Sequence, residues 1–366
     1  MNNAKSQTSF RIDFKVLSIL LLIAVAPLLV GSWWLFSSFQ NTYLDMVGSN
    51  LSQAADMTFS AINSYFQNQI IEIAGLAESP ALREEINKAN LELERDTEGV
   101  RKAIPKMEAA WLSLRASDPR LRAIMENPAS RFLARYVEVN GSYREIVITD
   151  FVGRTVAASR KTSRYYHAPS PWWKEVYGDG VQGNVYVGDV TRDRNTSTLV
   201  MEIAQPVVDK SSGIIGEIKV LTGMQTIHSI IGSFRAAPGA TAVLMRAKGE
   251  VISAPGYNPF EWKTYPPTLD ILNARDKGRA YFVSATSPRA VFGLAQTNFK
   301  QLYPNLNWIL ATTSSVHDVL GPLDRLRRYF IYLVVAVIVA SLVAALLLSR
   351  EETRPIVEQD AHLETL

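Results

Sequence analysis

The residues best suited to hold a small molecule lie close together, between positions 165 and 177. This segment reads Tyr165-Tyr166-His167-Ala168-Pro169-Ser170-Pro171-Trp172-Trp173-Lys174-Glu175-Val176-Tyr177. Aromatic rings wall small pockets, where they stack on or surround an apolar or cationic group. Tyr165, Trp172, Trp173 and Tyr177 are therefore candidate pocket residues. The other interpretation is core packing, and because neighbours on a helix face different ways, one of the two tryptophans is expected to pack inward.

Polar residues that could complete such a pocket follow this segment. Tyr186 and Asp189 lie on an expected strand over residues 184–190, and Asp193 lies in an expected turn. A carboxylate beside aromatic rings favours an amine, because a buried carboxylate needs a cationic or hydrogen-bond-donating partner. Asp193 has another explanation, since aspartate in turns often bonds its own backbone. Tyr186 and Asp189 point to opposite faces unless Gly188 forms a bulge, and of the two we place Asp189 in the pocket.

Two arginines, Arg160 and Arg164, precede the aromatic segment. A guanidinium group binds a carboxylate through two parallel hydrogen bonds, so either arginine could receive an acidic ligand. Both could equally be exposed surface charges, and Arg160 is the one that we include among the candidate ligand-binding residues.

The composition argues against several other kinds of site. The chain has no cysteine, so it has no disulfide, no thiolate metal site and no cysteine nucleophile. Its four histidines are scattered, and no hydrolase, nucleotide-binding or zinc-protease motif occurs. A net charge of +3 is too small to indicate a nucleic-acid-binding surface. We therefore expect no catalytic residue, no metal, no cofactor and no nucleic acid partner.

Two uncharged apolar stretches, residues 16–36 and 329–348, lie near opposite ends of the chain. Each has the length that a helix needs to cross about 30 Å of hydrocarbon. Buried core helices are the alternative, but core helices are usually amphipathic. The sequence therefore predicts two membrane-spanning helices, with the lipid bilayer as a partner.

The charges beside the first stretch predict its orientation. Lys5, Arg11 and Lys15 precede it, which favours a cytoplasmic N-terminus and an exported central domain in a cell inner membrane. A group of arginines before the second stretch argues the other way. A cleaved signal peptide is the alternative for the first stretch, but the sequence around Trp33 and Trp34 has no small-residue cleavage site, and these rings suit a membrane interface.

The region between the two stretches begins with a long helix. From residue 39 to about 77, apolar residues recur every three to four positions, and Pro80 follows. Such a helix is roughly 55–60 Å long. Its apolar face packs either on its own domain or on a second copy in a homodimer, and the pattern is compatible with both.

The remaining pattern predicts an α+β fold with two stacked sheet modules on this helix. Residues 81–139 read as helices broken at Pro105, Pro119 and Pro128, before a strand–turn–strand over 143–159. A further helix and strands are expected over 169–177, 184–190, 199–208 and 216–221. A second, shorter sheet module follows. Its expected strands lie over 240–253, 280–286, 289–296 and 308–312, and a helix over 316–328 leads to the second membrane span.

These residues resemble the double Cache sensor domains of bacterial chemoreceptors, sensor kinases and cyclases. The resemblance covers most of residues 39–328 and depends on the order of its pieces: the long helix, the hairpin at 143–160, Trp172-Trp173, Gln205-Pro206-Val207 and Asn307-Trp308-Ile309-Leu310. It implies two PAS-like modules, with a ligand bound in the membrane-distal module.

The resemblance also sets the expected boundaries. They are a cytoplasmic tail at 1–15, a membrane helix at 16–38, a stalk helix at 39–80, a distal module at about 81–225, a proximal module at about 226–315, a return helix at 316–328, a membrane helix at 329–349 and a cytoplasmic tail at 350–366.

The chain departs from the amino-acid-binding branch of this family. That branch has an arginine two positions before a tryptophan, a following tyrosine and an aspartate on the last strand of the module. Here Ser170 stands two positions before Trp172, where that branch has its arginine, and Trp173 stands where it has its tyrosine. Glu217 is the only acid in residues 216–221. A plain α-amino acid is therefore not the ligand we expect.

The C-terminal residues resemble the start of a HAMP linker, at Thr353-Arg354-Pro355-Ile356. We expect either a sensor that lacks its cytoplasmic transmitter (a kinase, cyclase or chemoreceptor signalling module) or one that acts through a separate partner. The predicted function is a membrane-bound sensor of a small molecule. The alternative is an envelope interaction protein, which would expose the aromatic segment to a protein partner rather than bury it.

Overall fold

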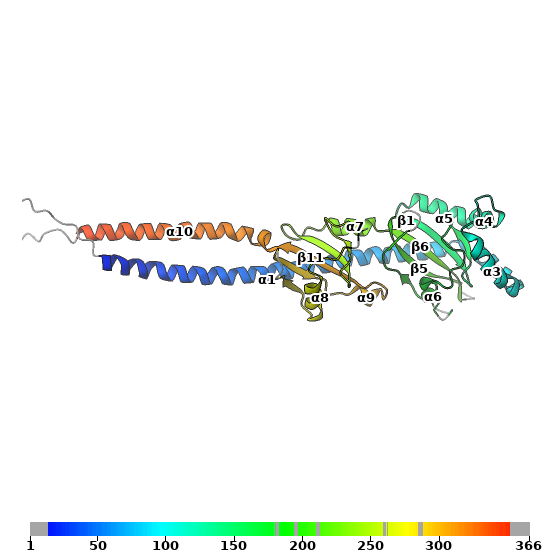
Figure 1. Cartoon of the computed structure of the whole chain (residues 1–366), viewed down its shortest axis with the longest axis horizontal. Coiled ribbons are helices and arrows are strands. Elements are labelled where there is room, and N and C mark those ends of the chain that lie inside the picture. The colour runs from blue at the N-terminus through cyan, green and yellow to red at the C-terminus, as the bar shows by residue number, and fades with distance from the viewer. Residues whose placement is uncertain are drawn as a thin grey trace, which may run out of the picture. The chain divides into compact units, whose positions relative to one another are not determined.

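The computed structural model describes residues 14–351, apart from 179, 181–182, 194–196, 210–212, 259–260, 262 and 285–287. The expected tails therefore lie outside the described residues except at 14–15 and 350–351, as does the HAMP-like segment. The chain divides into two compact units, one of Met1–Val47 with Val316–Leu366 and one of Gly48–Ser315. Each unit is described separately below (Figure 1).

The larger unit contains two antiparallel sheets in succession along the chain, which we call the first and second modules. The elements of the first module are α2 (Pro80–Arg95), α3 (Thr97–Trp111), α4 (Pro119–Met125), α5 (Pro128–Val139), β1 (Tyr143–Asp150), β2 (Thr155–Ala158), α6 (Pro171–Tyr177), β3 (Tyr186–Val187), β4 (Thr191–Arg192), β5 (Leu199–Asp209) and β6 (Gly213–Gly223). Those of the second are α7 (Gln225–Gly232), β7 (Thr241–Arg246), β8 (Val251–Ser253), α8 (Thr268–Asp276), β9 (Tyr281–Val283), β10 (Ala290–Leu294), α9 (Phe299–Leu302) and β11 (Trp308–Ser315).

Each module is built on one sheet. The first sheet has the strand order β2-β1-β6-β5-β3, with β4 also paired to β5, and the second has the order β8-β7-β11-β10-β9. All pairings are antiparallel. The two central strands of the first sheet, β5 and β6, are the longest at eleven residues each. The α+β fold with two sheet modules is thus confirmed.

Helix α1 (Phe14–Ala77) supports both sheets with the part that begins at Gly48. In the second module, Thr312 Oγ1 donates a hydrogen bond of 2.8 Å to the carbonyl oxygen of Leu51. In the first, Gln205 Nε2 donates one of 3.0 Å to the carbonyl oxygen of Ile70. In the second module, Gly293 of β10 is required where this strand meets α1, because a Cβ atom there would lie 2.3 Å from the backbone of Leu51 and Ser52.

The apolar face of α1 is covered by its own chain. Leu51, Phe59 and Phe66 are 0–4% exposed, and the Phe59 ring lies 4.5 Å from that of Phe299 between centroids. The ring centroids of Trp308 and Phe66 lie 6.1 Å apart. From Leu51 to Ala77 the periodic pattern therefore reflects packing within one chain, and there it does not by itself call for a second copy.

Most elements lie where the sequence predicts them, but α7, α8 and α9 were not expected, and β6 and β11 extend beyond the expected strands. Pro119 and Pro128 begin α4 and α5, as expected, but Pro105 lies inside α3. Proline has no N–H group, so the carbonyl oxygen four residues earlier has no helical hydrogen bond. Because the Pro105 side chain is exposed, this carbonyl oxygen lies on the solvent side of the helix. The expected strand over 184–190 is only Tyr186–Val187, and a second short strand follows at Thr191–Arg192.

The smaller unit consists of helical segments from both ends of the chain. Helix α10 (Val316–Glu351) includes one stretch, Val316–Val343, that is long and apolar enough to cross a membrane, with a mean hydropathy of 2.0. Among the described residues this is the single helix that meets those criteria of length and composition. In the N-terminal part of α1, Trp33 and Trp34 are 74% and 66% exposed.

Candidate functional site

The face of the first sheet that lies under α6 carries an unusual number of polar side chains. Along β5, Gln205 points to α1, so its neighbours Ala204 and Pro206 point to the opposite face. The register places Lys219 of β6 beside Ala204, and Glu217 beside Pro206. On β1, Thr149 is paired with Glu217. Direct partners in a sheet share a face, so these residues lie together under α6.

Helix α6 covers this face because of its position and its sequence. Pro171 begins the helix and Gly178, with a φ of 55°, ends it. Trp172 and Val176 are buried against Ala204, and Trp173 and Tyr186 pack around them. The Nζ atom of Lys219 lies 5.5 Å from the centroid of the Trp172 ring, which is a cation–π contact.

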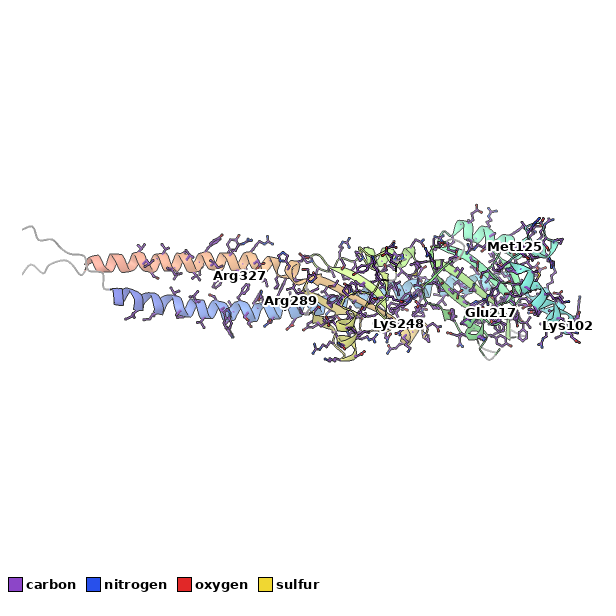
Figure 2. The ribbon with its side chains drawn as sticks, in the orientation of Figure 1. Lys102, Met125, Glu217, Lys248, Arg289 and Arg327 are labelled. Atoms are coloured by element: carbon purple, nitrogen blue, oxygen red, sulfur yellow. The ribbon has the colours of Figure 1, made fainter. Side chains whose placement is uncertain are left out.

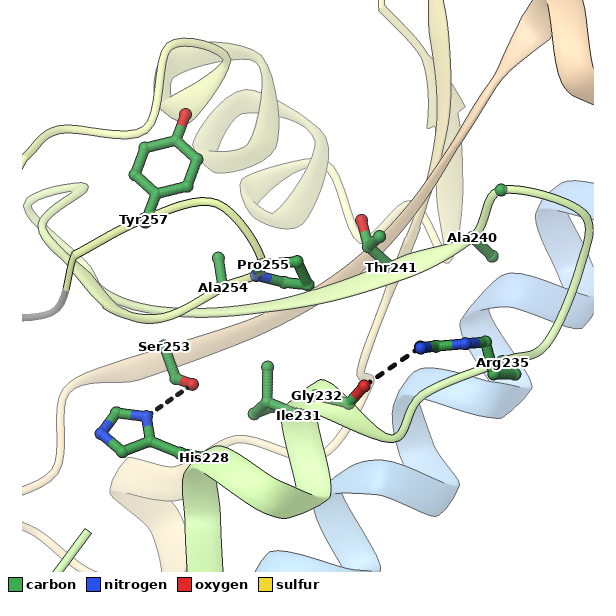
Figure 3. Close-up of a pocket in the computed structure, with 11 residues that line it drawn as sticks. His228, Ile231, Gly232, Arg235, Ala240, Thr241, Ser253, Ala254, Pro255 and Tyr257 are labelled. Atoms are coloured by element: carbon green, nitrogen blue, oxygen red, sulfur yellow. Dashed lines mark hydrogen bonds between the residues drawn. The ribbon is translucent and has the colours of Figure 1, made fainter. Parts of the chain in front are cut away.

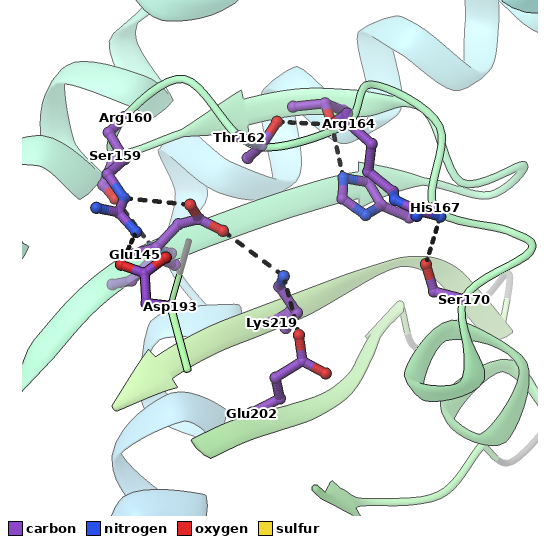
Figure 4. Close-up of polar contacts among 12 residues, drawn as sticks. Glu145, Ser159, Arg160, Thr162, Arg164, His167, Ser170, Asp193, Glu202 and Lys219 are labelled. Carbon is purple, nitrogen blue, oxygen red and sulfur yellow. Dashed lines mark hydrogen bonds and ion pairs between the residues drawn. The ribbon is translucent and has the colours of Figure 1, made fainter. Parts of the chain in front are cut away.

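A network of buried charges occupies one end of this face (Figure 4). Lys219 Nζ lies 3.6 Å from Glu145 and 3.5 Å from Glu202. Arg160 forms ion pairs of 3.2 Å with Glu145 and 3.1 Å with Asp193. Two cations thus face three carboxylates, and the partly exposed Arg160 and Glu202 keep contact with solvent, so the buried Glu145, Asp193 and Lys219 are each paired with an opposite charge.

The other end of the face has polar atoms that no protein group satisfies. Among the described residues, five buried side-chain atoms there have no hydrogen-bond partner. They are Thr149 Oγ1, His167 Nδ1, Trp173 Nε1 and both carboxylate oxygens of Glu217. Buried polar atoms are almost always paired, because an unpaired one costs about 1–3 kcal/mol. A cluster of unpaired donors and acceptors under a covering helix therefore suits a small polar molecule.

Burial keeps the two titratable groups of this cluster uncharged at neutral pH. Desolvation raises the pKa of Glu217 to about 10. Desolvation, and then the charges of Lys219 and Arg164, lower the pKa of His167 well below its usual value. The His167 ring also contacts Thr155 Oγ1 through Nε2 at 3.1 Å and lies 5.4 Å from the Trp172 ring. A protonated Glu217 can donate as well as accept a hydrogen bond.

Five of the eight predicted ligand-binding residues meet at this face. Trp172, Trp173 and Tyr186 belong to the cluster under α6, and Arg160 and Asp193 belong to the charge network. All five come from the segments that the sequence singled out, on β3, α6 and the loops around them.

The structure places the other three predicted residues differently. Tyr177 stacks on Trp173, with ring centroids 4.8 Å apart, and lies outside the cluster of Trp172, Val176 and Ala204. Tyr165 packs on Trp111 in a separate cluster with α3 and α4. Asp189 accepts hydrogen bonds from Trp308 Nε1 at 2.7 Å and Arg246 Nε at 2.8 Å, so its carboxylate contacts the second module.

The sequence reasoning missed most of the residues on the strands themselves. Glu145, Thr149, Glu202 and Lys219 were not proposed, and Glu217 was noted only as an acid on its strand. His167, in the loop before α6, was named only as part of the aromatic segment. A signal was present, because Glu217 and Lys219 are two apart in an otherwise apolar strand and so share one face. Within the described part of the chain, no group of histidine, aspartate or glutamate side chains is arranged to hold a metal ion.

The comparisons with known proteins concern the fold. No model of a protein family matches the sequence, and no curated protein matches it. The chain is similar to the ligand-binding domain of the Campylobacter jejuni chemoreceptor Tlp3, solved with L-norvaline, at 12% identity and a TM-score of 0.48, over 78% of this chain and 94% of that one. It is also similar to the ligand-binding domain of the Pseudomonas fluorescens chemoreceptor CtaA, solved with L-leucine, at 10% identity and a TM-score of 0.46, over 78% and 99%. Both of these solved structures are ligand-binding domains of chemoreceptors.

Proposed function

We propose that the protein is a membrane-bound sensor that binds a small polar molecule between α6 and the first sheet. The observation that carries this proposal is the group of five buried polar atoms without partners under α6. A ligand that pairs with them would recover the free energy that their burial costs. The aromatic segment favours a pocket over a docking surface, since Trp172 is 3% exposed. The envelope-interaction alternative would need these rings at the surface.

The ligand class follows from the groups that remain free. Lys219 and Arg160 are already paired with carboxylates, so neither offers an uncommitted charge to an acidic ligand. Glu217 offers both oxygens, and Trp173 offers a single N–H donor. A molecule with a donor group toward Glu217 and an acceptor toward Trp173 fits this set, and it need not be an α-amino acid.

The sensor role also requires a route from this site to the rest of the protein. Asn305 Nδ2 lies 3.1 and 3.0 Å from the two carboxylate oxygens of Glu175 on α6. Together with the contacts of Asp189, this joins the cover of the site to the start of β11. Strand β11 ends at Ser315 and α10 begins at the next residue. Ligand binding that moves α6 would therefore act on α10, provided that the ligand binds one arrangement more tightly.

In this proposal α10 and the N-terminal part of α1 cross the inner membrane, and the larger unit lies outside the cytoplasm. The apolar stretch of α10 supports the second crossing, and the basic residues before residue 16 support the orientation. The protein has no catalytic role in this account. A cytoplasmic transmitter and a second copy of the chain are its proposed partners.

A thermal-unfolding screen of the full-length protein in detergent tests the proposal. Amines, organic acids, amino acids and purines are added one at a time, and unfolding is followed by tryptophan fluorescence. A ligand at one hundred times its Kd adds about 2.7 kcal/mol to the free energy of unfolding. The stabilisation should be lost in Trp173→Phe, which removes the free N–H, and retained in Trp111→Phe, whose N–H is already paired with the carbonyl oxygen of Thr162. Equal responses in both variants would contradict the proposed site.

A further inference from the structure

The second module contains a separate cavity, between α7 and the edge strand β8. It has a volume of about 540 Å³, which is the size of a small-molecule site. Helix α7 provides His228, Ile231 and Gly232, while Ser253 and Pro255 come from β8 and the residues that follow it. Figure 3 shows the His228 and Arg235 side chains at opposite ends of the space, with Ile231 between them.

Arg235 lines this cavity, and one edge of its guanidinium group has no hydrogen-bond partner among the described residues. Its Nη1 atom donates hydrogen bonds to the carbonyl oxygens of Gly232 at 3.0 Å and Phe234 at 2.5 Å. Its Nε and Nη2 groups bond to no described residue. These two groups form the side of a guanidinium that binds a carboxylate through two parallel hydrogen bonds. The two carbonyl contacts hold the guanidinium in place, so less side-chain freedom is lost when a carboxylate binds.

The rest of the lining fits a carboxylate with an apolar body. No acidic side chain is among the described residues that line the cavity, so the Arg235 charge is not neutralised there. The His228 ring contacts Ser253 Oγ through Nδ1 at 2.8 Å, and burial lowers the pKa of this histidine. Between these polar ends the wall is apolar, formed by Ile231, Ala254 and Pro255.

We propose that this cavity binds a small monocarboxylate, with its carboxylate on Arg235 and its apolar part against Ile231. This site is independent of the proposed site under α6, because it lies on another sheet and shares no residue with it. Its position gives it a structural consequence. Helix α7 follows β6 of the first module after Met224, whereas β8 belongs to the second sheet. A ligand between α7 and β8 would hold the connecting helix against the second module.

Thermal unfolding of the full-length protein with defined probes tests this proposal. Butyrate and benzoate are compared with butyramide and benzamide, which have the same shape and no charge. Two variants remove the site by different means. Arg235→Gln removes the charge, and Gly232→Leu adds a bulky side chain to the cavity lining at a position where a Cβ atom meets nothing within 4 Å. Arg289→Gln removes an exposed charge from the same module, outside the cavity, and serves as the matched control (Figure 2).

The proposal predicts that at least one acid raises the melting temperature of the wild type and of Arg289→Gln, and that its amide does not. Apparent affinity should be weaker by about tenfold or more in Arg235→Gln and in Gly232→Leu, because a charge-assisted pair contributes about 1.5–3 kcal/mol. Trp173→Phe should leave this response unchanged, which separates it from the site under α6. Equal responses to acids and amides, unchanged affinity in both cavity variants, or no response to either acid would overturn the proposal.

Discussion

At the scale of single residues, the unpaired polar atoms under α6 should respond to substitution differently from paired polar atoms elsewhere in the core. Thr149 and Thr312 are both fully buried, yet Thr149 Oγ1 has no described partner whereas Thr312 Oγ1 bonds the backbone of α1. Replacing each by valine keeps the shape and removes the hydroxyl. Thr149→Val should raise the melting temperature by about 2–4 °C, and Thr312→Val should lower it by a similar amount. A loss of stability in Thr149→Val would mean that its hydroxyl is paired within the protein.

The burial of Glu217 should make the stability of the protein depend on pH. Its pKa is raised to about 10 in the folded protein from 4.5 in the reference state, so the unfolded chain loses its proton first as the pH rises. Folding stability should therefore fall between about pH 4.5 and 10, by at most about 1.4 kcal/mol per pH unit. Glu217→Gln should remove this slope and stabilise the protein at pH 8, as urea unfolding at several pH values would show. Glu250→Gln, at a partly exposed ion pair, is the control, and a wild-type slope no steeper than that of Glu217→Gln would contradict the assignment.

At the scale of elements, Asp189 is predicted to hold the two modules together. Asp189→Ala removes the hydrogen-bond acceptor of the buried Trp308 N–H and of Arg246 Nε, which should cost about 2 kcal/mol. Glu250→Ala removes another partner of Arg246 without affecting Trp308, and it should cost less than about 1 kcal/mol. Urea unfolding of the two variants measures both values. Equal losses in the two variants would show that the Trp308 bond contributes nothing.

The sequence predicts the elements of this fold better than the contacts between them. The hairpin over residues 143–159 and the helix bearing Trp172 are local patterns of alternation and capping, and they lie where expected. Asp189 could not be placed in the same way, because its partners are 57 and 119 residues away. The acid on β6 was visible in the sequence, but the face that α6 covers depends on the order of strands in the sheet.

At the scale of the whole molecule, the structure changes the expected dimer contact. Leu51 and Phe59 are buried within the chain, whereas Met57 and Ile71 on α1 are 72% and 67% exposed. These two are fourteen residues apart, four turns of the helix, and therefore share one side of it. Because the chain has no cysteine, Met57→Cys and Ile71→Cys should form disulfide-linked dimers in membranes under oxidation. Leu51→Cys should not, and the absence of cross-linking at both exposed positions would count against a dimer through this face of α1.

The central claim is that a small polar molecule binds between α6 and the first sheet. An experimental structure of the full-length protein with the most stabilising compound from the thermal screen tests it most directly. The account predicts that the compound lies under Trp172 and within hydrogen-bond distance of Glu217 and Trp173 Nε1. The account would be contradicted if the compound bound elsewhere while these polar atoms were paired with protein groups beneath a closed α6.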